Sequence, residues 1–424
     1  MVGALKTVTL GCKVNQYETQ YVREALLKAG YTFAQPGEAA ELCLVNSCTV
    51  TAESDAKSRQ AIRRLIRENP EARVVVMGCY ATRAPEEIVA LGEGVEVLAD
   101  KRDLPALLSS LGVVEPPVGI SRFGDRSRAY VKVQDGCRLR CTYCIIPQVR
   151  PHVSSRPVVE VSDEVRRLVD NGYGEIVLTG VHLGHYGRET AGGGRSADAP
   201  SLATLVRQIA AVAGEFRVRL SSIEATEVTP ELLETMRDFP EKVCPHLHIC
   251  LQSGSDRVLH RMRRRWSRRL FLQRCQLVRE RLDQPALTTD VLVGFPGESD
   301  ADFEDTCRVL EEVGFSKIHA FPFSPRAGTP AAVMPDPVPR AIRTARVRHV
   351  AEVERDLRQR YFASLIGRRL RVLVEAGGGR YGDGRVGTAC RYAPVELPAG
   401  GYRLGQLVDV KADEVLAGAR IRAV

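Results

Sequence analysis

The chain has 424 residues, enough for two or three domains, and its 44% hydrophobic and 26% charged residues are typical of a packed globular protein. Its net charge of +8 comes mainly from arginine, which suits phosphate contacts, so a nucleic-acid partner and an ordinary basic surface explain it equally well. No apolar run predicts a membrane span, and the N-terminus predicts no signal peptide. Twelve cysteines in such a chain favour metal ligation over a disulfide framework.

The first third of the chain alternates short strands with helices. Apolar, β-branched runs predict strands over 6–10, 41–46 and 73–77, and helical patterns follow at about 17–29, 53–68 and 84–91. Such alternation predicts a parallel sheet covered by helices on its faces. We therefore expect an N-terminal α/β domain over residues 1–118, followed by a proline- and glycine-containing linker.

A second alternation predicts a central domain over residues 129–360. Its strands are expected at 129–134, 175–180, 217–222, 246–251, 287–294 and 317–323, with helices between them at about 160–171, 201–213, 229–238, 255–283 and 300–313. Six strand–helix repeats are too few for a closed eight-stranded barrel. They predict a partial (β/α)6 barrel whose open side can admit a large substrate.

After a helix predicted over 339–366, residues 366–424 show short strands separated by glycines. This tail carries ten Arg and Lys against six Asp and Glu, so it holds +4 of the net charge of +8. A small basic β-barrel is the expected fold. The whole chain is thus predicted to be an α/β protein with a parallel α/β domain, a partial barrel and a C-terminal β-barrel.

Three cysteines, Cys137, Cys141 and Cys144, lie in the stretch "GCRLRCTYC", just after the first barrel strand. A structural zinc ion there requires a fourth ligand, and His152 is the nearest candidate. A cubane iron–sulfur cluster held by three thiolates leaves one iron open to a substrate or cofactor. The position on the loop after a barrel strand favours the second interpretation, because such barrels carry their chemistry on that face.

Three further cysteines, Cys12, Cys48 and Cys79, are far apart in the sequence, but each follows a predicted parallel strand. The carboxyl ends of parallel strands lie at one edge of the sheet, where open α/β folds bind ligands. Three thiolates can therefore converge there. The alternative is three unrelated buried cysteines, since cysteine is commonly buried.

The stretch "CRLRCTYC" matches the C-x3-C-x-aromatic-C signature of radical S-adenosylmethionine (SAM) enzymes, with Tyr143 at the aromatic position. In that family the open iron chelates the amino and carboxylate groups of SAM. The motifs "GCKVNQYET", "NSCTVT" and "GCYA" resemble those of the methylthiotransferases, a radical SAM subfamily, and the resemblance extends over essentially the whole chain. The first two motifs are most similar to the MtaB-type branch, which acts on N6-threonylcarbamoyladenosine at position 37 of tRNA.

The resemblance implies a cytoplasmic enzyme with two 4Fe–4S clusters and SAM as cofactors. Cys12, Cys48 and Cys79 would hold the auxiliary cluster, and the second triad would hold the SAM cluster. One SAM would methylate a sulfur on the auxiliary cluster. Another would be cleaved to the 5′-deoxyadenosyl radical, which activates the adenosine at its C2–H position. The basic tail resembles the TRAM RNA-binding domain, tRNA is the implied partner, and a flavodoxin or ferredoxin is the implied reductant.

Further site residues follow from family motifs at strand ends. The expected SAM contacts are Tyr143, Thr179, Gly180, Ser222, Glu224, Gln252, Ser253, Gly294 and Gly297, although a tight turn alone also explains the last two glycines. The expected RNA contacts are Arg263, Arg264, Arg265, Trp266 and, at the rim of the active site, Arg326. A solvated helix face and an ordinary turn are the respective alternatives.

The sequence departs from the family pattern at Pro151, where glycine is expected, and at His185, where a small residue is commoner. Both positions lie near the cluster rather than among its ligands. Three alternatives remain for the function. The same chemistry can act on isopentenyladenosine-37 of tRNA or on an aspartate of ribosomal protein S12, or the protein is a non-enzymatic RNA-binding protein with two structural zinc ions.

Overall fold

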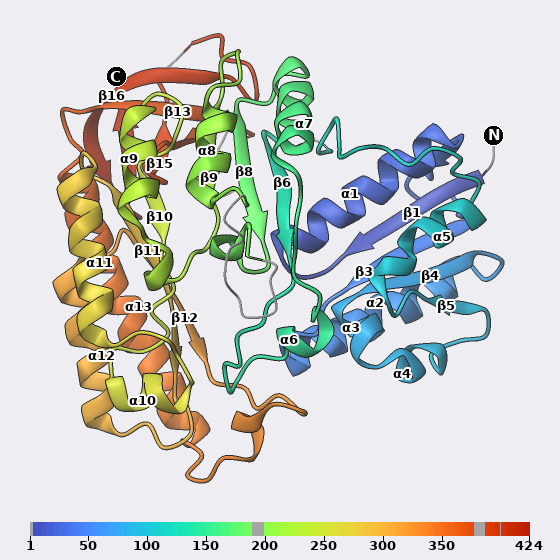
Figure 1. The fold of residues 1–424 in the computed structure, drawn as a ribbon, viewed down its shortest axis with the longest axis horizontal. Coiled ribbons are helices and arrows are strands. Elements are labelled where there is room, and N and C mark those ends of the chain that lie inside the picture. The colour runs from blue at the N-terminus through green and yellow to red at the C-terminus, as the bar shows by residue number, and fades with distance from the viewer. Residues whose placement is uncertain (1–2, 125, 189–198, 377–385, 399) are drawn as a thin grey trace. The chain divides into compact units, whose positions relative to one another are not determined.

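The computed structural model describes residues 3–124, 126–188, 199–376, 386–398 and 400–424 (Figure 1). The chain forms two compact units. The first contains residues up to Gly124 together with Asp135–Val153 and Ser324–Ala332, and the second contains Asp125–Gln134, Ser154–Phe323 and Val333–Val424. The loop with Cys137, Cys141 and Cys144 therefore packs with the N-terminal unit.

The first unit is built on a five-stranded parallel sheet with the order β2-β1-β3-β4-β5. The predicted strands are confirmed as β1 (Gly3–Thr9), β3 (Leu42–Ser47) and β4 (Arg73–Gly78), and the sheet gains β2 (Tyr31–Phe33) and β5 (Val95–Val97) at its edges. The helices are α1 (Lys13–Lys28), α2 (Ala52–Glu68), α3 (Cys79–Arg83), α4 (Pro85–Val89), α5 (Leu104–Ser110) and the short α6 (Ile146–Val149).

Alternating side chains of β3 and β4 form two separate cores, one on each face of this sheet. Leu42 and Leu44 pack in a cluster with residues of α1 and α5, whereas Cys43 and Val45 pack with residues of α2, α3 and α4. Successive residues of a strand point to opposite faces. A continuous apolar run is consequently buried on both sides, which is typical of a parallel sheet.

The second unit contains the predicted partial barrel. Its parallel strands are β6 (Arg128–Asp135), β8 (Glu175–Gly180), β9 (Arg217–Leu220), β10 (His246–His248), β11 (Ala286–Val293) and β12 (Lys317–Pro322). They form the sheets β7-β6-β8-β9, with β7 at Ser154–Ser155, and β10-β11-β12. Bridges such as Val218↔Val243 and Ile223↔Ile249 connect β9 with the segment around β10. Within the described residues, β12 ends the strand order without pairing with β6, so the barrel is open on that side.

The helices of this unit are α7 (Val158–Asp170), α8 (Leu202–Ala210), α9 (Pro230–Asp238), α10 (Asp256–Arg261), α11 (Arg268–Arg281), α12 (Asp300–Val313) and α13 (Arg340–Ala363). The prediction of one helix over 255–283 is wrong, because a turn separates α10 from α11. Arg263 adopts a left-handed conformation with φ 56°, and the Ser267 side chain caps α11 by accepting from the Leu270 N–H. Both features end one helix and begin another.

The C-terminal tail forms the expected small barrel, closed with the order β13-β14-β15-β17-β16. Its strands are β13 (Arg369–Glu375), β14 (Val386–Ala389), β15 (Pro394–Glu396), β16 (Leu407–Leu416) and β17 (Arg420–Ala423). Buried aliphatic side chains such as Leu370, Val372 and Ile421 fill it. The predicted fold class is therefore confirmed.

A buried ion-pair network joins the partial barrel to the small barrel inside the second unit. Glu175 at the start of β8 is fully buried and accepts from Arg217 Nε at 2.6 Å and Arg219 Nη2 at 3.0 Å. Arg217 also donates to the Thr388 carbonyl at 2.7 Å, and Arg219 donates to the Cys390 carbonyl at 3.1 Å. These arginines lower the pKa of Glu175 well below its usual value despite its burial.

Candidate functional site

Three cysteines lie at the carboxyl edge of the N-terminal sheet, as the sequence predicts. Cys12 follows β1 and occupies the N-cap position of α1, Cys48 follows β3 directly, and Cys79 follows β4 and begins α3. Because β1, β3 and β4 are adjacent parallel strands, the three cysteines come from three neighbouring strand ends. Cys12 is exposed, whereas Cys48 and Cys79 are buried.

Glycines keep this edge free of side chains. Gly11 has φ 97°, and a Cβ built on it would lie 2.9 Å from the Cys48 sulfur. Gly78 has φ 101°, and a Cβ there would overlap the backbone of Ser47. Positive φ is accessible to glycine without a steric cost. The two glycines therefore permit the close approach of the loops that carry Cys12, Cys48 and Cys79.

The thiols at this edge differ in their surroundings. Burial raises the pKa of the Cys48 thiol, although hydrogen bonds from the Val50 backbone and Ser54 oppose this effect. A thiol must lose its proton to ligate a metal, and the charge of a metal ion favours that loss.

A buried arginine from the second cysteine loop contacts this site. Arg150 donates from Nε to the Cys79 sulfur at 3.2 Å. Its Nη atoms donate to both carboxylate oxygens of Glu18 at 2.9 and 3.0 Å, to Asn15 Oδ1 at 2.8 Å and to Asp135 Oδ1 at 2.8 Å. Every donor direction of the guanidinium is therefore used. Sequence inspection did not single out this arginine, and its position beside the Pro151 departure was the available signal.

The backbone of Arg150 also holds the loop with the second cysteine triad. The Cys137 N–H donates to the Arg150 carbonyl at 3.2 Å, and the Cys144 N–H donates to the Cys141 carbonyl at 3.1 Å. The Ala331 N–H donates to the Thr142 carbonyl at 2.8 Å, which fastens the loop to the segment Ser324–Ala332 of the same unit. Tyr143, the expected SAM neighbour, lies in this loop and is partly buried.

The spacing of the cysteine sulfur atoms distinguishes a zinc site from an iron–sulfur cluster site. Among the described residues, neither cysteine triad brings its sulfur atoms within 4.8 Å of one another, as ligands of a single metal ion would be. His152, the candidate fourth zinc ligand, is exposed. A cubane cluster binds each thiolate to a separate iron, so its ligands stand farther apart. The donor set of three thiols therefore fits a 4Fe–4S cluster better than a zinc ion.

The other expected SAM contacts lie in the second unit, after the carboxyl ends of successive barrel strands. Thr179 and Gly180 end β8, Ser222 and Glu224 follow β9, Gln252 and Ser253 follow β10, and Gly294 and Gly297 follow β11. Enzymes built on such barrels carry their functional groups at this end.

Several of these residues also have structural roles. Ser253 is buried, and its hydroxyl lies 3.3 Å from the Thr306 hydroxyl of α12. Gly294 has φ 73°, its N–H donates to Glu298 at 2.5 Å, and a Cβ on it would overlap Arg343. Gly297 has φ 74°. A tight turn alone therefore explains the positive φ of Gly294 and Gly297.

Two groups of possible metal ligands at this end of the barrel, one buried and one half-buried, were not predicted as sites from the sequence. His182, His185 and Glu227 bring ligand atoms within 4.8 Å of one another, with 2.5 Å between His182 Nε2 and a Glu227 oxygen. Burial lowers the pKa of His185 to about 4. His248 and Cys250 form the second group with an aspartate of the neighbouring strand, Asp290.

Some of the expected RNA contacts are buried, and others are exposed. Trp266 is buried, with the Arg264 guanidinium 3.9 Å from its ring centroid, and Arg264 pairs with Glu224. Arg263 and Arg265 are exposed. Arg326 is buried in the first unit. There it pairs with Asp55 at 2.6 Å and donates to Thr49. Burial and pairing favour a structural role for Arg264, Trp266 and Arg326.

Comparisons with known proteins agree with this architecture. Residues 131–310 match the Radical SAM superfamily, and residues 4–100 match a family described as uncharacterized, UPF0004. The radical SAM methyltransferase TsrM of Kitasatospora setae, solved with cobalamin and a [4Fe-4S] cluster, has a TM-score of 0.56 at 15% identity, over 78% of this chain and 77% of that one. This likeness shows the shared fold. Within the described residues, no helix combines the length and hydropathy needed to span a membrane.

Proteins found by sequence comparison have a higher identity to this chain than that structure. The chain is 38% identical to threonylcarbamoyladenosine tRNA methylthiotransferase MtaB of Chlamydia pneumoniae, over 97% of this chain and 96% of the relative. It is 39% identical to MtaB of Bacillus subtilis, over 87% and 84% of the two chains. A tRNA-2-methylthio-N(6)-dimethylallyladenosine synthase of Corynebacterium efficiens is 32% identical, over 96% and 82%. The chain therefore belongs to the MtaB family of radical SAM tRNA methylthiotransferases, enzymes that use S-adenosylmethionine and [4Fe–4S] clusters.

Proposed function

We propose that the substrate is N6-threonylcarbamoyladenosine at position 37 of tRNA and that the product is its 2-methylthio derivative. The main support is the 38% sequence identity with a threonylcarbamoyladenosine tRNA methylthiotransferase over 97% of this chain. The relatives named for dimethylallyladenosine are 32% identical. Relatives named MtaB range from 32% to 40% identity, and the three at 38–40% favour the threonylcarbamoyl branch, as do the motifs around Cys12 and Cys48.

The two cysteine triads are assigned to two clusters in this proposal. Cys12, Cys48 and Cys79 hold the auxiliary cluster, supported by their place at three adjacent strand ends. Cys137, Cys141 and Cys144 hold the cluster that binds SAM, supported by their spacing and by the barrel-strand loop that carries them. Exposed Cys12 leaves the auxiliary site accessible at one corner.

When bound, the clusters and SAM supply the radical and the methylthio group, because the adenosine C2–H is not acidic enough for a protein base. The protein residues position and shield these groups. Arg150 donates a hydrogen bond to Cys79 and fixes the backbone of Cys137, so one residue orders both cysteine loops. The polar residues after β8, β9, β10 and β11 are the proposed SAM contacts. Charge-assisted hydrogen bonds at buried ligands tune a cluster's potential.

The remaining assignments follow from the same reaction. We place the N-terminal methylthiotransferase domain at 1–118, the radical SAM barrel at 129–360 and a TRAM-like RNA-binding barrel at 366–424. A low-potential reductant such as flavodoxin or ferredoxin supplies the electron, and the enzyme acts in the cytoplasm, where its substrate is found.

Nucleoside mass spectrometry of tRNA tests the proposal. In cells that lack the gene, the methylthiolated threonylcarbamoyladenosine should disappear while its unthiolated precursor accumulates. A gene carrying Cys48→Ala should fail to restore the product, and Cys307→Ala, a half-buried cysteine of α12, should restore it. Loss of the methylthiolated isopentenyl nucleoside instead would assign the other tRNA branch. Unchanged tRNA with a modified ribosomal protein S12 would overturn the tRNA substrate.

A further inference from the structure

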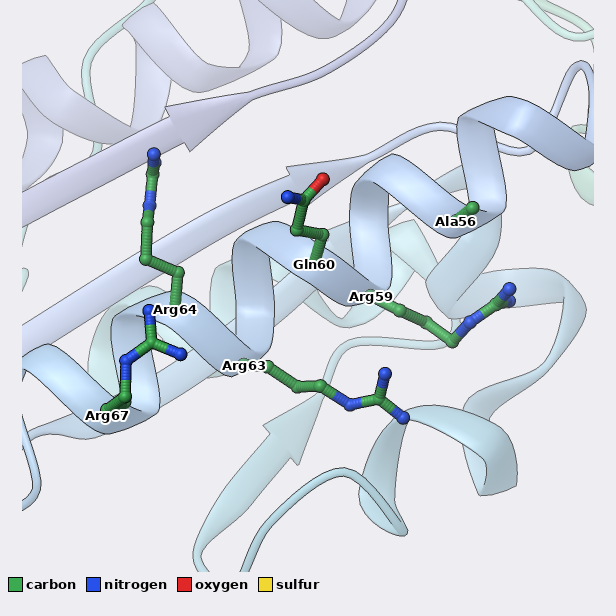
Figure 2. A pocket seen from close by; sticks show the side chains of 6 residues that line it. All are labelled: Ala56, Arg59, Gln60, Arg63, Arg64 and Arg67. Atoms are coloured by element: carbon green, nitrogen blue, oxygen red, sulfur yellow. The ribbon is translucent and has the colours of Figure 1, made fainter.

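The C-terminal two-thirds of α2 carries an exposed face of arginines. Figure 2 shows Arg59, Arg63, Arg64 and Arg67 extending from the helix, with Gln60 between Arg59 and Arg63 and Ala56 before Arg59. Together they line a shallow groove of about 350 Å³. We call these four residues the α2 arginine face. Arg63, Arg64 and Arg67 are exposed, and Arg59 is half-buried.

The charge of this face is not balanced. From Ala56 to Arg67 the sequence has five basic residues and no acidic one. Arg59 donates to the Tyr80 hydroxyl at 2.9 Å and lies 4.0 Å from Glu87. In the described ranges, no carboxylate lies within ion-pair distance of Arg63, Arg64 or Arg67. Three guanidinium groups therefore present all their donors to solvent.

The arrangement stabilises the helix only in part, through the favourable position of Arg67 in the last turn. Arg63 and Arg67 are four residues apart, and like charges at that spacing cost about 0.2 to 0.5 kcal/mol. Several exposed arginines elsewhere in the described chain pair with a carboxylate. Arg166 pairs with Asp163 at 2.6 Å, Arg308 pairs with Asp305, and Arg422 pairs with Glu414 at 2.7 Å. On α2, three exposed arginines without an ion-pair partner among the described residues lie together around one groove, which suits an external anion.

The side chains of the α2 arginine face determine which class of molecule it can bind. It offers planar guanidinium groups, which bind phosphate oxygens bidentately. The arginines at positions 59, 63 and 67 repeat at about 6 Å along the helix axis, so they can follow a chain of phosphates. An acidic protein would need apolar anchors at the centre of its interface. The groove offers only the alanine and the stems of the arginines.

We propose that the α2 arginine face binds the phosphate backbone of the tRNA substrate. The inference rests on the proposed function and adds a binding surface to it. Helix α2 begins only four residues after Cys48, in the same compact unit as all six cluster cysteines. A phosphate contact there positions the tRNA without reading its sequence, because backbone contacts carry no base information.

Equilibrium binding of unmodified tRNA across a range of salt concentrations tests the proposal. The purified, anaerobically reconstituted protein is compared with R63Q/R64Q/R67Q. Each lost phosphate contact lowers the slope of log K against log[salt] by about 0.7 to 0.9, so the slope should fall by about 2 to 3. Affinity at physiological salt should fall by about ten- to a hundredfold, while iron content and melting temperature stay at wild-type values.

Two matched variants complete the test. R63K/R64K/R67K keeps the charge and should retain most of the salt slope. R102Q/R166Q/R308Q removes the same charge at exposed arginines that pair with Asp100, Asp163 and Asp305, and it should bind tRNA as the wild type does. An unchanged salt slope in R63Q/R64Q/R67Q would overturn the proposal, even if nucleoside analysis supports the reaction. Unchanged tRNA binding with slower reduction by flavodoxin would assign the face to an acidic protein instead.

Discussion

The Arg150 guanidinium donates a hydrogen bond to the Cys79 sulfur across 3.2 Å, and the two residues are 71 positions apart in the chain. The same side chain pairs with Glu18 at 2.9 Å and Asp135 at 2.8 Å, and its carbonyl accepts from Cys137 N–H. One buried residue therefore links Cys79 to the loop that carries Cys137, Cys141 and Cys144, within a single compact unit.

Replacing this arginine should affect both stability and the auxiliary centre. Arg150→Gln removes a cationic partner of Asp135 and of Glu18, which keeps Lys101, so the free energy of unfolding should fall by about 3 kcal/mol. It also weakens hydrogen bonding to a cluster thiolate, which should lower the reduction potential of the auxiliary cluster. Redox titration followed by electron paramagnetic resonance measures the potential, and chemical denaturation measures the stability. Arg102→Gln, at an exposed ion pair, is the control; an unchanged potential in Arg150→Gln would contradict the role.

The cysteine assignments predict how iron is divided between the triads. Replacing Cys12, Cys48 and Cys79 together by alanine should remove about half of the iron, because the second triad holds a cluster of its own. The remaining cluster should still bind SAM and change its spectrum upon SAM addition. Cys275→Ala, at a buried core thiol, should retain all iron. Loss of all iron in the triple variant, with the fold intact, would contradict two independent clusters.

Glu175 should make stability depend on pH. Arg219, Arg217 and Arg128 lower its folded-state pKa, so its ionised form stabilises the fold above the unfolded-state pKa of about 4.3. That contribution is lost as pH falls through the folded-state value. Glu175→Gln should therefore lower the free energy of unfolding by about 3 kcal/mol near neutral pH. The difference from wild type should shrink as the pH falls below the unfolded-state pKa of about 4.3. Urea denaturation from pH 3 to 8 measures it; a gap independent of pH would show that the charge of Glu175 is not the cause.

Gly294 should tolerate no side chain. Its φ of 73° is costly for alanine, and a Cβ there would overlap the Arg343 side chain. Gly294→Ala should lower the melting temperature and weaken SAM binding if the turn contacts SAM as proposed. Gly37→Ala provides a matched control, because Gly37 has φ 86° with open space around its Cβ position. Equal losses of stability in both variants would show that backbone strain alone matters.

Local patterns were enough to predict much of the fold. The apolar runs of β3 and β4 were recognisable because a parallel strand buried on both faces must be continuously apolar. Since the carboxyl ends of such strands meet at one edge, Cys12, Cys48 and Cys79 could be placed together without knowledge of the contacts. The expected helix over 255–283 failed because a single residue, Arg263, leaves the helical conformation with φ 56°, which no periodicity reveals.

The sequence by itself thus determined the order of elements, the open barrel and the edge that carries three of the cysteines, because these depend on periodicity and on strand direction. Only the tertiary structure decided which side chains meet. It brings Arg150 to Cys79, buries Trp266 beneath Arg264, and adds Asp290 from a neighbouring strand to His248 and Cys250. It also shows which charges have partners, pairing Arg326 with Asp55 while leaving Arg63, Arg64 and Arg67 without a nearby carboxylate among the described residues. Such contacts depend on packing between segments that are distant in the sequence, and local sequence patterns do not reveal that packing.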